Sequence, residues 1–201
     1  MNSGAALISL TALFALPALQ GQTLSGPDLV KALRHGGYVI VMRHASSPRE
    51  KPDVYTADPG NLNVERQLDA GGQYSATAFG KALHHLKIPV GEVFSSPTYR
   101  AIETARLANL GTPRPEGELG DNGANMKATT DAQAAWLRKK VADFPSGTNI
   151  ILITHQPNIA GAFPDLPAAE DGEAIIFGPD GKGGAAVVAR VKIDEWPKMK
   201  G

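Results

Sequence analysis

Residues 38–44 read YVIVMRH, an unbroken apolar run that is followed by an arginine and a histidine. An apolar run of this length, directly after two glycines, predicts a strand that is covered on both faces. A second run, NIILITH at residues 149–155, repeats the pattern and also ends in a histidine. Open α/β sheets bind their ligands at the carboxyl ends of such strands. The two runs therefore predict a shared crevice that contains His44 and His155.

Helical patterns alternate with the strand patterns along the rest of the chain. The spacing of apolar residues and of Gly, Pro and capping residues predicts helices over 28–34, 69–86, 97–110 and 131–144, with Asp69, Pro97 and Asp131 at three of their beginnings. Further strands are predicted over 92–95, 116–119, 173–177 and 185–193. The glycines at 181–184 link two strands, which indicates a hairpin turn rather than a phosphate-binding loop. The fold class expected is a three-layer α/β/α sandwich around a mostly parallel sheet, with an antiparallel C-terminal addition.

The first 21 residues have the composition of a signal peptide. Residues 5–19 are apolar apart from two hydroxyl side chains, and small and polar residues follow them. The run is shorter than the roughly 20 residues that span a bilayer, so no stable membrane span is expected. No Lys or Arg precedes it, and a buried or lipid-anchoring helix is the alternative. The organisation expected is a leader over 1–21, one domain over 22–201, and a periplasmic or secreted location.

Composition excludes several classes of function. The 201 residues are 42% hydrophobic, and 20 Lys and Arg balance 20 Asp and Glu. A chain without excess positive charge is a poor candidate for binding nucleic acid. It contains no cysteine, so disulfides, zinc–thiolate sites and thiol nucleophiles are excluded. Any catalysis must use His, Asp, Glu, Ser, Lys or Arg.

Two arginines accompany the two histidines. Arg43 precedes His44, and Arg100 lies near the start of the helix that follows SSPTY at residues 95–99. Guanidinium groups match the oxygens of a phosphate group, and phosphoryl transfer depends largely on such positioning and charge. Either histidine taken alone could be a strand-end residue with local hydrogen bonds. Together the four side chains predict a site for a small-molecule phosphate ester.

Four stretches occur in an order that resembles the histidine phosphatase superfamily, also called phosphoglycerate-mutase-like. They are VMRHA (41–45), RQLDAGG (66–72), FSSPTYRAIETA (94–105) and ITH (153–155). The resemblance implies that His44 is the nucleophile that forms a phosphohistidine. It also implies that Arg43, Arg100 and His155 hold the phosphoryl group, that Ser96 binds substrate beside them, and that no metal or cofactor is required.

A second Arg-His pair competes with this assignment. LRHGG at residues 33–37 spells the Arg-His-Gly of the superfamily more literally than Arg43-His44-Ala45 does. His35, however, precedes the strand, where Arg and His favourably end a helix before its glycine. We interpret His35 as a helix-terminal residue, and His84 and His85 as solvated or packing residues of a helix.

The general acid that protonates the leaving oxygen is the open assignment. Expelling an alkoxide without a proton is costly, so a carboxylic acid is expected. One branch of the superfamily carries it in a loop like LGDNG at residues 119–123, which nominates Asp121, with Glu118 as an alternative. In the other branch an aspartate follows the second histidine, but Gln156 stands there. Glu173 is a third candidate, and a good leaving group would need no protein acid.

The sequence thus predicts a phosphomonoester hydrolase. The resemblance is strongest to compact envelope phosphatases, including those that act on heptose phosphates of lipopolysaccharide, which suggests an envelope or sugar phosphate as substrate. Mutases of the superfamily carry extra segments that this chain lacks. Two alternatives stay open: a weak or inactive phosphate-binding or regulatory domain of the same fold, and a metal hydrolase with His44 and His155 as ligands. The oligomeric state is not predicted.

Overall fold

The computed structural model describes residues 23–48, 65–121 and 129–201. Its centre is a mixed sheet in the order β3-β2-β4-β1-β5-β6. The parallel strands are β1 (Tyr38–Arg43), β2 (Val90–Ser95), β3 (Arg114–Pro115) and β4 (Asn149–Thr154). The strands β5 (Ala174–Pro179) and β6 (Ala185–Val191) form an antiparallel hairpin beside β1. The predicted fold class is therefore confirmed, including the antiparallel C-terminal addition.

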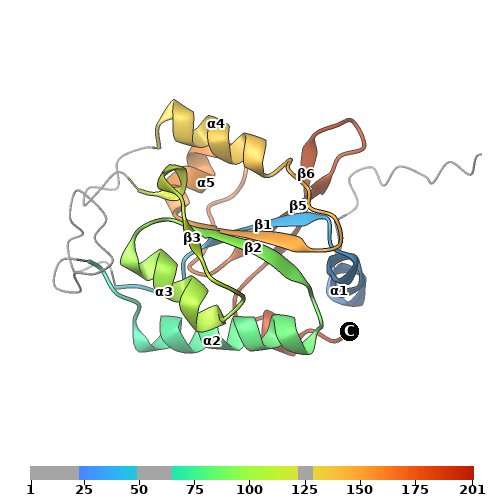
Figure 1. Cartoon of the computed structure of the whole chain (residues 1–201), viewed down its shortest axis with the longest axis horizontal. Helices are drawn as coiled ribbons and strands as arrows, with labels where there is room; N and C mark the ends of the chain where they lie inside the picture. The colour runs from blue at the N-terminus through green and yellow to red at the C-terminus, as the bar shows by residue number, and fades with distance from the viewer. Residues whose placement is uncertain (1–22, 49–64, 122–128) are drawn as a thin grey trace, which may run out of the picture.

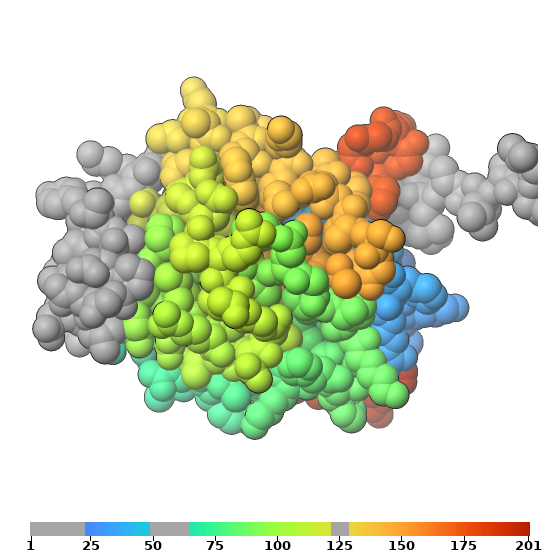
Figure 2. Space-filling model, viewed as in Figure 1, coloured from blue at the N-terminus to red at the C-terminus, as the bar shows by residue number. Residues whose placement is uncertain are grey.

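Helices cover both faces of this sheet (Figure 1). On one face lie α1 (Gly26–His35), α2 (Ala70–His85) and α3 (Tyr99–Ala108). On the other lie α4 (Asp131–Lys140) and α5 (Gln156–Ala162). Figure 2 shows the same division on the surface, with α4 on one side of the sheet and α2 and α3 on the other. Because β1 and β4 lie between two layers, almost all of their side chains are buried, which explains their continuous apolar sequence.

The strand register sets the position of the two histidines. Arg43 pairs with Thr154 across β1 and β4, and Ser95 pairs with Ile153 across β2 and β4. The hydrogen bonding continues one residue further, since the His44 N–H donates to the Thr154 carbonyl at 3.0 Å. His44 and His155 are thus the first residues beyond two adjacent parallel strands, as the sequence predicted.

Local boundaries differ from the sequence prediction in several places. The helix expected from Pro97 begins at Tyr99, because the Ser96 hydroxyl accepts the Thr98 N–H at 3.2 Å and holds a turn there. Thr130, not Asp131, caps α4, and it forms a reciprocal capping box with Gln133. Where a strand was expected over 116–119, the structure has a 3₁₀ turn (η1, Gly117–Leu119), which follows the two-residue strand β3 along the chain.

The helix α5 was not predicted. It begins directly after His155, and Pro157 occupies its first turn, where the missing N–H costs nothing. Seven residues between a strand and a proline-rich loop are too few for the apolar spacing of a helix to stand out. The expected leader over 1–21 lies outside the described residues.

Candidate active site

The loop after β1 is fixed by the segment that begins α2. Asp69 caps α2 by accepting the Gly72 N–H at 2.7 Å, and its other oxygen accepts the Ser46 hydroxyl at 2.6 Å. At Gly72 a Cβ atom would lie 2.1 Å from the Ser46 carbonyl oxygen, so only glycine allows this approach. The stretch RQLDAGG therefore holds the chain that leaves His44.

His44 is held as a neutral imidazole with a defined tautomer. Its Nδ1 lies 2.8 Å from the Ala45 carbonyl oxygen, which can only accept a hydrogen bond, so Nδ1 carries the proton. The Arg100 Nε–H donates to Nε2 at 3.2 Å, so Nε2 presents its lone pair. Burial, followed by the charge of Arg100, holds the pKa of His44 well below its usual 6.5, although the bond to Ala45 opposes the shift. Nε2 is therefore unprotonated at neutral pH, as a nucleophile must be, and its lone pair accepts the hydrogen bond from Arg100.

His155 lies with its ring centroid 5.2 Å from that of His44 and is also neutral. Arg100 Nη2 donates to its Nδ1 at 3.2 Å, so its Nε2 carries the proton and donates to the Ser96 hydroxyl at 2.8 Å. Burial, then the charge of Arg100, lowers the pKa of His155 well below its usual value. One buried guanidinium thus contacts both imidazoles.

Asp121 completes this group. Its carboxylate forms an ion pair with Arg100, and its Oδ2 lies 3.8 Å from His155 Nδ1. The side chain is only 4% exposed. In the described part of the chain Arg100 therefore contacts His44, His155 and Asp121.

Arg43 lies at the end of β1 and is held by the segment before β5. Its Nη1 donates to the Ala169 carbonyl at 2.8 Å, and its Nη2 lies 2.5 Å from the Asp171 carboxylate. Gln156, which stands where one branch of the superfamily has its acid, accepts the Ala169 N–H at 2.7 Å. Gln156 therefore supports the segment that binds Arg43.

The other two carboxylate candidates have different partners. Both oxygens of Glu173 accept hydrogen bonds from Arg190, at 2.7 and 3.0 Å. Burial raises the pKa of Glu173, but the bonds from Arg190 and the Glu170 N–H outweigh it and leave the pKa below its usual value. A hydrogen bond with Glu116 lowers the pKa of Glu118. Among the described residues, Asp121 is the candidate that pairs with Arg100 and lies near His155, so the geometry favours Asp121.

Ser96 and His35 occupy distinct positions. Ser96 is buried, and its hydroxyl lies against the His155 ring, so it orients that histidine; a direct contact with substrate stays a prediction. His35 lies in the last turn of α1, with Nδ1 2.7 Å from the Lys31 carbonyl oxygen, at the amino end of β1. The interpretation of His35 as a helix-terminal residue agrees with this position.

Sequence reasoning missed two residues of the site. Arg66 is buried, and its charge helps to lower the pKa of both His44 and His155, which makes it a third nearby cation. Thr104 accepts the Ala45 N–H at 3.1 Å and donates to the Arg100 carbonyl at 2.7 Å, so it links α3 to the loop after His44. Both lie in the stretches quoted for the resemblance, which was the only signal available for them.

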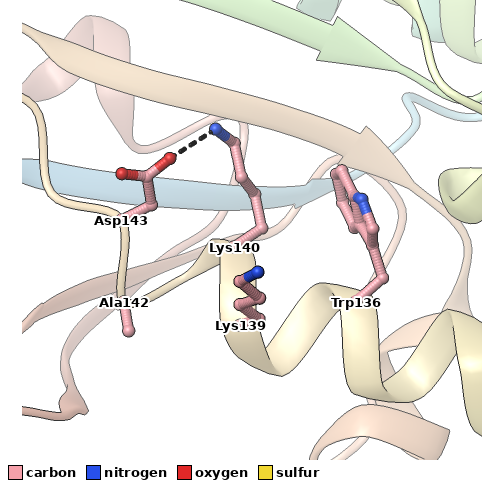
Figure 3. A pocket seen from close by; sticks show the side chains of 5 residues that line it. All are labelled: Trp136, Lys139, Lys140, Ala142 and Asp143. Atoms are coloured by element: carbon pink, nitrogen blue, oxygen red, sulfur yellow. Dashed lines mark hydrogen bonds and ion pairs between the residues drawn. The ribbon is translucent and has the colours of Figure 1, made fainter.

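A separate hollow of about 520 Å³ lies at the C-terminal end of α4 (Figure 3). Its lining comprises Trp136, Lys139, Lys140, Ala142 and Asp143. Lys140 is already paired with Asp143 at 2.8 Å and lies 4.8 Å from the centre of the Phe94 ring. No nucleophile and base are paired in this lining, so the histidine cluster is the better candidate for chemistry.

The described residues give two further findings. Among residues 23–48, 65–121 and 129–201, no three His, Asp or Glu side chains are grouped so that they could hold a metal ion. Within the same ranges, no helix has the length and apolar character needed to cross a membrane.

The fold matches solved structures of histidine phosphatases. The protein histidine phosphatase SixA in complex with tungstate superposes with a TM-score of 0.56 at 17% identity, over 79% of this chain and 98% of that one. The alpha-ribazole phosphatase from Shigella flexneri gives a TM-score of 0.53 at 13% identity, over 75% and 94% of the two chains. The open reading frame Rv3214 from Mycobacterium tuberculosis gives 0.54 at 17% identity, over 75% and 95%.

These likenesses define the class of fold: the chain has an α/β fold like that of the protein histidine phosphatase SixA and the other two solved structures. No family model and no curated protein sequence matches it. At identities of 13–17% the similarity lies in the backbone arrangement, and the chemistry has to be argued from the residues above.

Proposed function

We propose that this protein is a phosphomonoester hydrolase that works through a phosphohistidine on His44. The observation that carries the proposal is the tautomer of His44, whose Nδ1 is bound to a carbonyl and whose Nε2 lone pair lies among buried guanidinium groups. A phosphate group drawn to Arg43 and Arg100 would be placed next to that lone pair. Fixed guanidinium charges stabilise the transferring phosphoryl group, so the proposed reaction uses no metal.

The reaction consists of two displacements. His44 Nε2 forms a bond to phosphorus while the ester P–O bond breaks, and the leaving oxygen takes a proton from Asp121. In this scheme the proton reaches Asp121 from the monoanionic form of the substrate ester. Water then attacks phosphorus, the N–P bond breaks, and the carboxylate of Asp121 accepts the proton of the water. Orthophosphate leaves, and the imidazole returns to its neutral form.

The proposed substrate class is an envelope or sugar phosphate, and the proposed location is outside the cytoplasm after removal of residues 1–21. The composition of the leader supports the location, and the resemblance to compact envelope phosphatases supports the substrate class. The N-terminal residue of protein recovered from the producing cell tests the export. A mature chain that begins at Met1 would contradict it.

The chemistry is tested by trapping the intermediate. Protein is mixed rapidly with an aryl phosphate, and mass spectrometry locates acid-labile phosphate. We expect it on His44, and we expect His44→Ala to lose the adduct and about 10³-fold or more of kcat/KM. His35→Ala is the matched control, because His35 also follows an arginine but lies in the last turn of α1, at the amino end of β1.

Three results would contradict the proposal. Turnover that persists in His44→Ala would remove the nucleophile, and turnover that is lost on chelation and restored by a metal would favour the metal hydrolase. Tight orthophosphate binding without turnover of any ester would favour the alternative of a phosphate-binding domain. Gln156, which stands where one branch of the superfamily has its acid, makes that alternative worth testing.

A further inference from the structure

The backbone just before Asp121 is held by an unusual arrangement of side chains. Asn158, in α5, donates both hydrogens of its Nδ2 group, to the Glu118 carbonyl at 3.2 Å and to the Gly120 carbonyl at 2.9 Å. Those carbonyls are separated by one residue, and a single amide group bridges them. The peptide unit that leads into Asp121 is therefore tied to the helix that begins after His155.

Two more donors act on the same short segment. The Thr154 hydroxyl, from the last residue of β4, donates to the Leu119 carbonyl at 2.8 Å. Gln133 Nε2, from α4, donates to the Gly120 carbonyl at 3.0 Å. Three consecutive carbonyls thus receive side-chain hydrogen bonds from three different elements. A loop held in this way keeps its last residue at a defined distance from the strand that ends in His155.

The side chain of Asn158 makes no other hydrogen bond among the described residues. Asn158 is 2% exposed, and its Oδ1 has no hydrogen-bond partner in that part of the chain. Burying an amide is unfavourable unless its polar atoms are bonded. The contribution of Asn158 therefore lies in the two bonds that its Nδ2 makes to the loop.

We infer that Asn158 is a positioning residue that holds Asp121 at the distance from which it protonates the leaving oxygen. The inference rests on the proposed function and extends it to a residue that touches neither substrate nor phosphoryl group. Asp121 already contacts Arg100 and lies 3.8 Å from His155. A shift of about 1 Å in such a group lowers the rate about 10²-fold, so the anchor of the loop matters as much as the carboxyl itself.

The role has a signature that general destabilisation lacks. An aryl phosphate with a weakly basic leaving oxygen departs without a proton, whereas an alkyl phosphate needs one. Loss of the proton donor therefore slows alkyl esters selectively. This selective slowing appears in kcat/KM, because kcat/KM reports the transfer of the phosphoryl group to His44. It appears there even where hydrolysis of the phosphohistidine limits kcat.

The experiment compares three variants over a series of phosphate esters of increasing leaving-group basicity. Asp121→Asn removes the donor, and Asn158→Leu removes both bonds to the loop while keeping the number of side-chain heavy atoms. Asn149→Leu is the matched control: Asn149 is also buried, its Nδ2 also donates to two carbonyls, at 2.7 and 2.8 Å, and its Oδ1 also lacks a partner in the described residues. It begins β4, at the opposite edge of the sheet.

We expect Asn158→Leu to lower kcat/KM for alkyl phosphates about 10- to 100-fold, part of the 10²–10⁴-fold that a general acid contributes. Turnover of p-nitrophenyl phosphate should stay within about threefold, and the dependence on leaving-group basicity should steepen as it does in Asp121→Asn. Asn149→Leu should leave that dependence unchanged. Thr154→Val, an isosteric loss of one bond to the loop, should steepen it to a lesser degree, and it provides the same test should Asn158→Leu not fold.

The inference is overturned if Asn158→Leu or Thr154→Val lowers kcat/KM for all esters by the same factor, as loss of a purely structural residue would. It is also overturned if kcat/KM of Asp121→Asn depends on leaving-group basicity no more steeply than kcat/KM of the unaltered protein. These failures differ from failure of the proposed function, in which the unaltered protein forms no phosphohistidine and releases no phosphate from any ester.

Discussion

At the scale of single residues, Arg100 determines the protonation of both histidines. A guanidinium group can only donate hydrogen bonds, so each imidazole nitrogen that faces Arg100 must be unprotonated. The opposite nitrogens face the Ala45 carbonyl and the Ser96 hydroxyl, which accept their protons. The sequence predicted that these side chains converge. It could not predict the tautomers, because they depend on hydrogen bonds between residues that lie 55 to 59 positions apart.

The lowered pKa values make stability depend on pH. In the unfolded chain both histidines take up protons near pH 6.5, whereas in the folded state they stay neutral to a lower pH. The unfolded state then binds more protons, so the free energy of unfolding is fully present above about pH 6.5 and falls as the pH decreases below it. The expected slope is about 1.4 kcal/mol per pH unit for each histidine.

Urea unfolding between pH 7 and pH 5 measures this slope. Carboxyl groups with lowered pKa values, such as Glu173, stay ionised in the folded state over that interval. His44→Asn should therefore lose about half of the slope. An unchanged slope in that variant would show that burial of His44 does not control the pH dependence.

At the scale of elements, the site depends on how closely α2 packs against α3. Gly80 of α2 lies where a Cβ atom would be 1.8 Å from the Ala108 carbonyl oxygen of α3. Backbone cannot move aside as a flexible side chain can, so the two helices would have to separate. Since α3 carries Arg100, a displacement there would reach the histidines.

Gly80→Ala should lower the free energy of unfolding by about 1–3 kcal/mol, as overpacking in a core does. Gly71→Ala, on an exposed turn of the same helix, is the control. Its nearest neighbour is the Asp69 carboxylate oxygen at 3.2 Å, and its effect should stay within about 1 kcal/mol. Chemical denaturation measures both, and equal effects would show that the α2–α3 contact is not tight.

Element boundaries show where sequence reasoning is limited. The two central strands were predicted closely because burial on both faces leaves a continuous apolar run. The start of α3 was predicted two residues early, because Pro97 fits a first helical turn equally well. The hydrogen bond that the Thr98 N–H donates to the Ser96 hydroxyl is not visible in composition. The anchoring of the loop by Asn158 had no sequence signal either, since it joins elements distant along the chain.

At the scale of the whole molecule, the last residues close one helical layer. Trp196, in the 3₁₀ turn η2 (Trp196–Lys198), is fully buried and makes an edge-to-face contact with Phe79 of α2, with ring centroids 5.4 Å apart. The end of the chain accordingly lies beside α2 and α1 in Figure 1. The order of strands and layers was predicted from the sequence, but this closure was not, because a single tryptophan near a terminus has no periodic pattern.

Trp196→Ala should lower the free energy of unfolding by about 3–5 kcal/mol, the usual cost of truncating a buried aromatic residue. The other tryptophan, Trp136, lines the hollow in Figure 3 and is half-buried, so Trp136→Ala should cost at most about 2 kcal/mol. Thermal or urea unfolding of the two variants separates them. Equal losses would contradict the buried position of Trp196.

The placement of both ends of the described chain has a practical consequence. Leu24 hydrogen-bonds to Val188 of β6, and the position of Gly201 lies against Arg34 and Val30 of α1. Both ends therefore gather near the amino ends of the parallel strands, whereas His44 and His155 follow the carboxyl ends. An affinity tag, a fused reporter or a surface linker attached at residue 23 or at Gly201 would therefore lie at the opposite end of the parallel strands from His44 and His155.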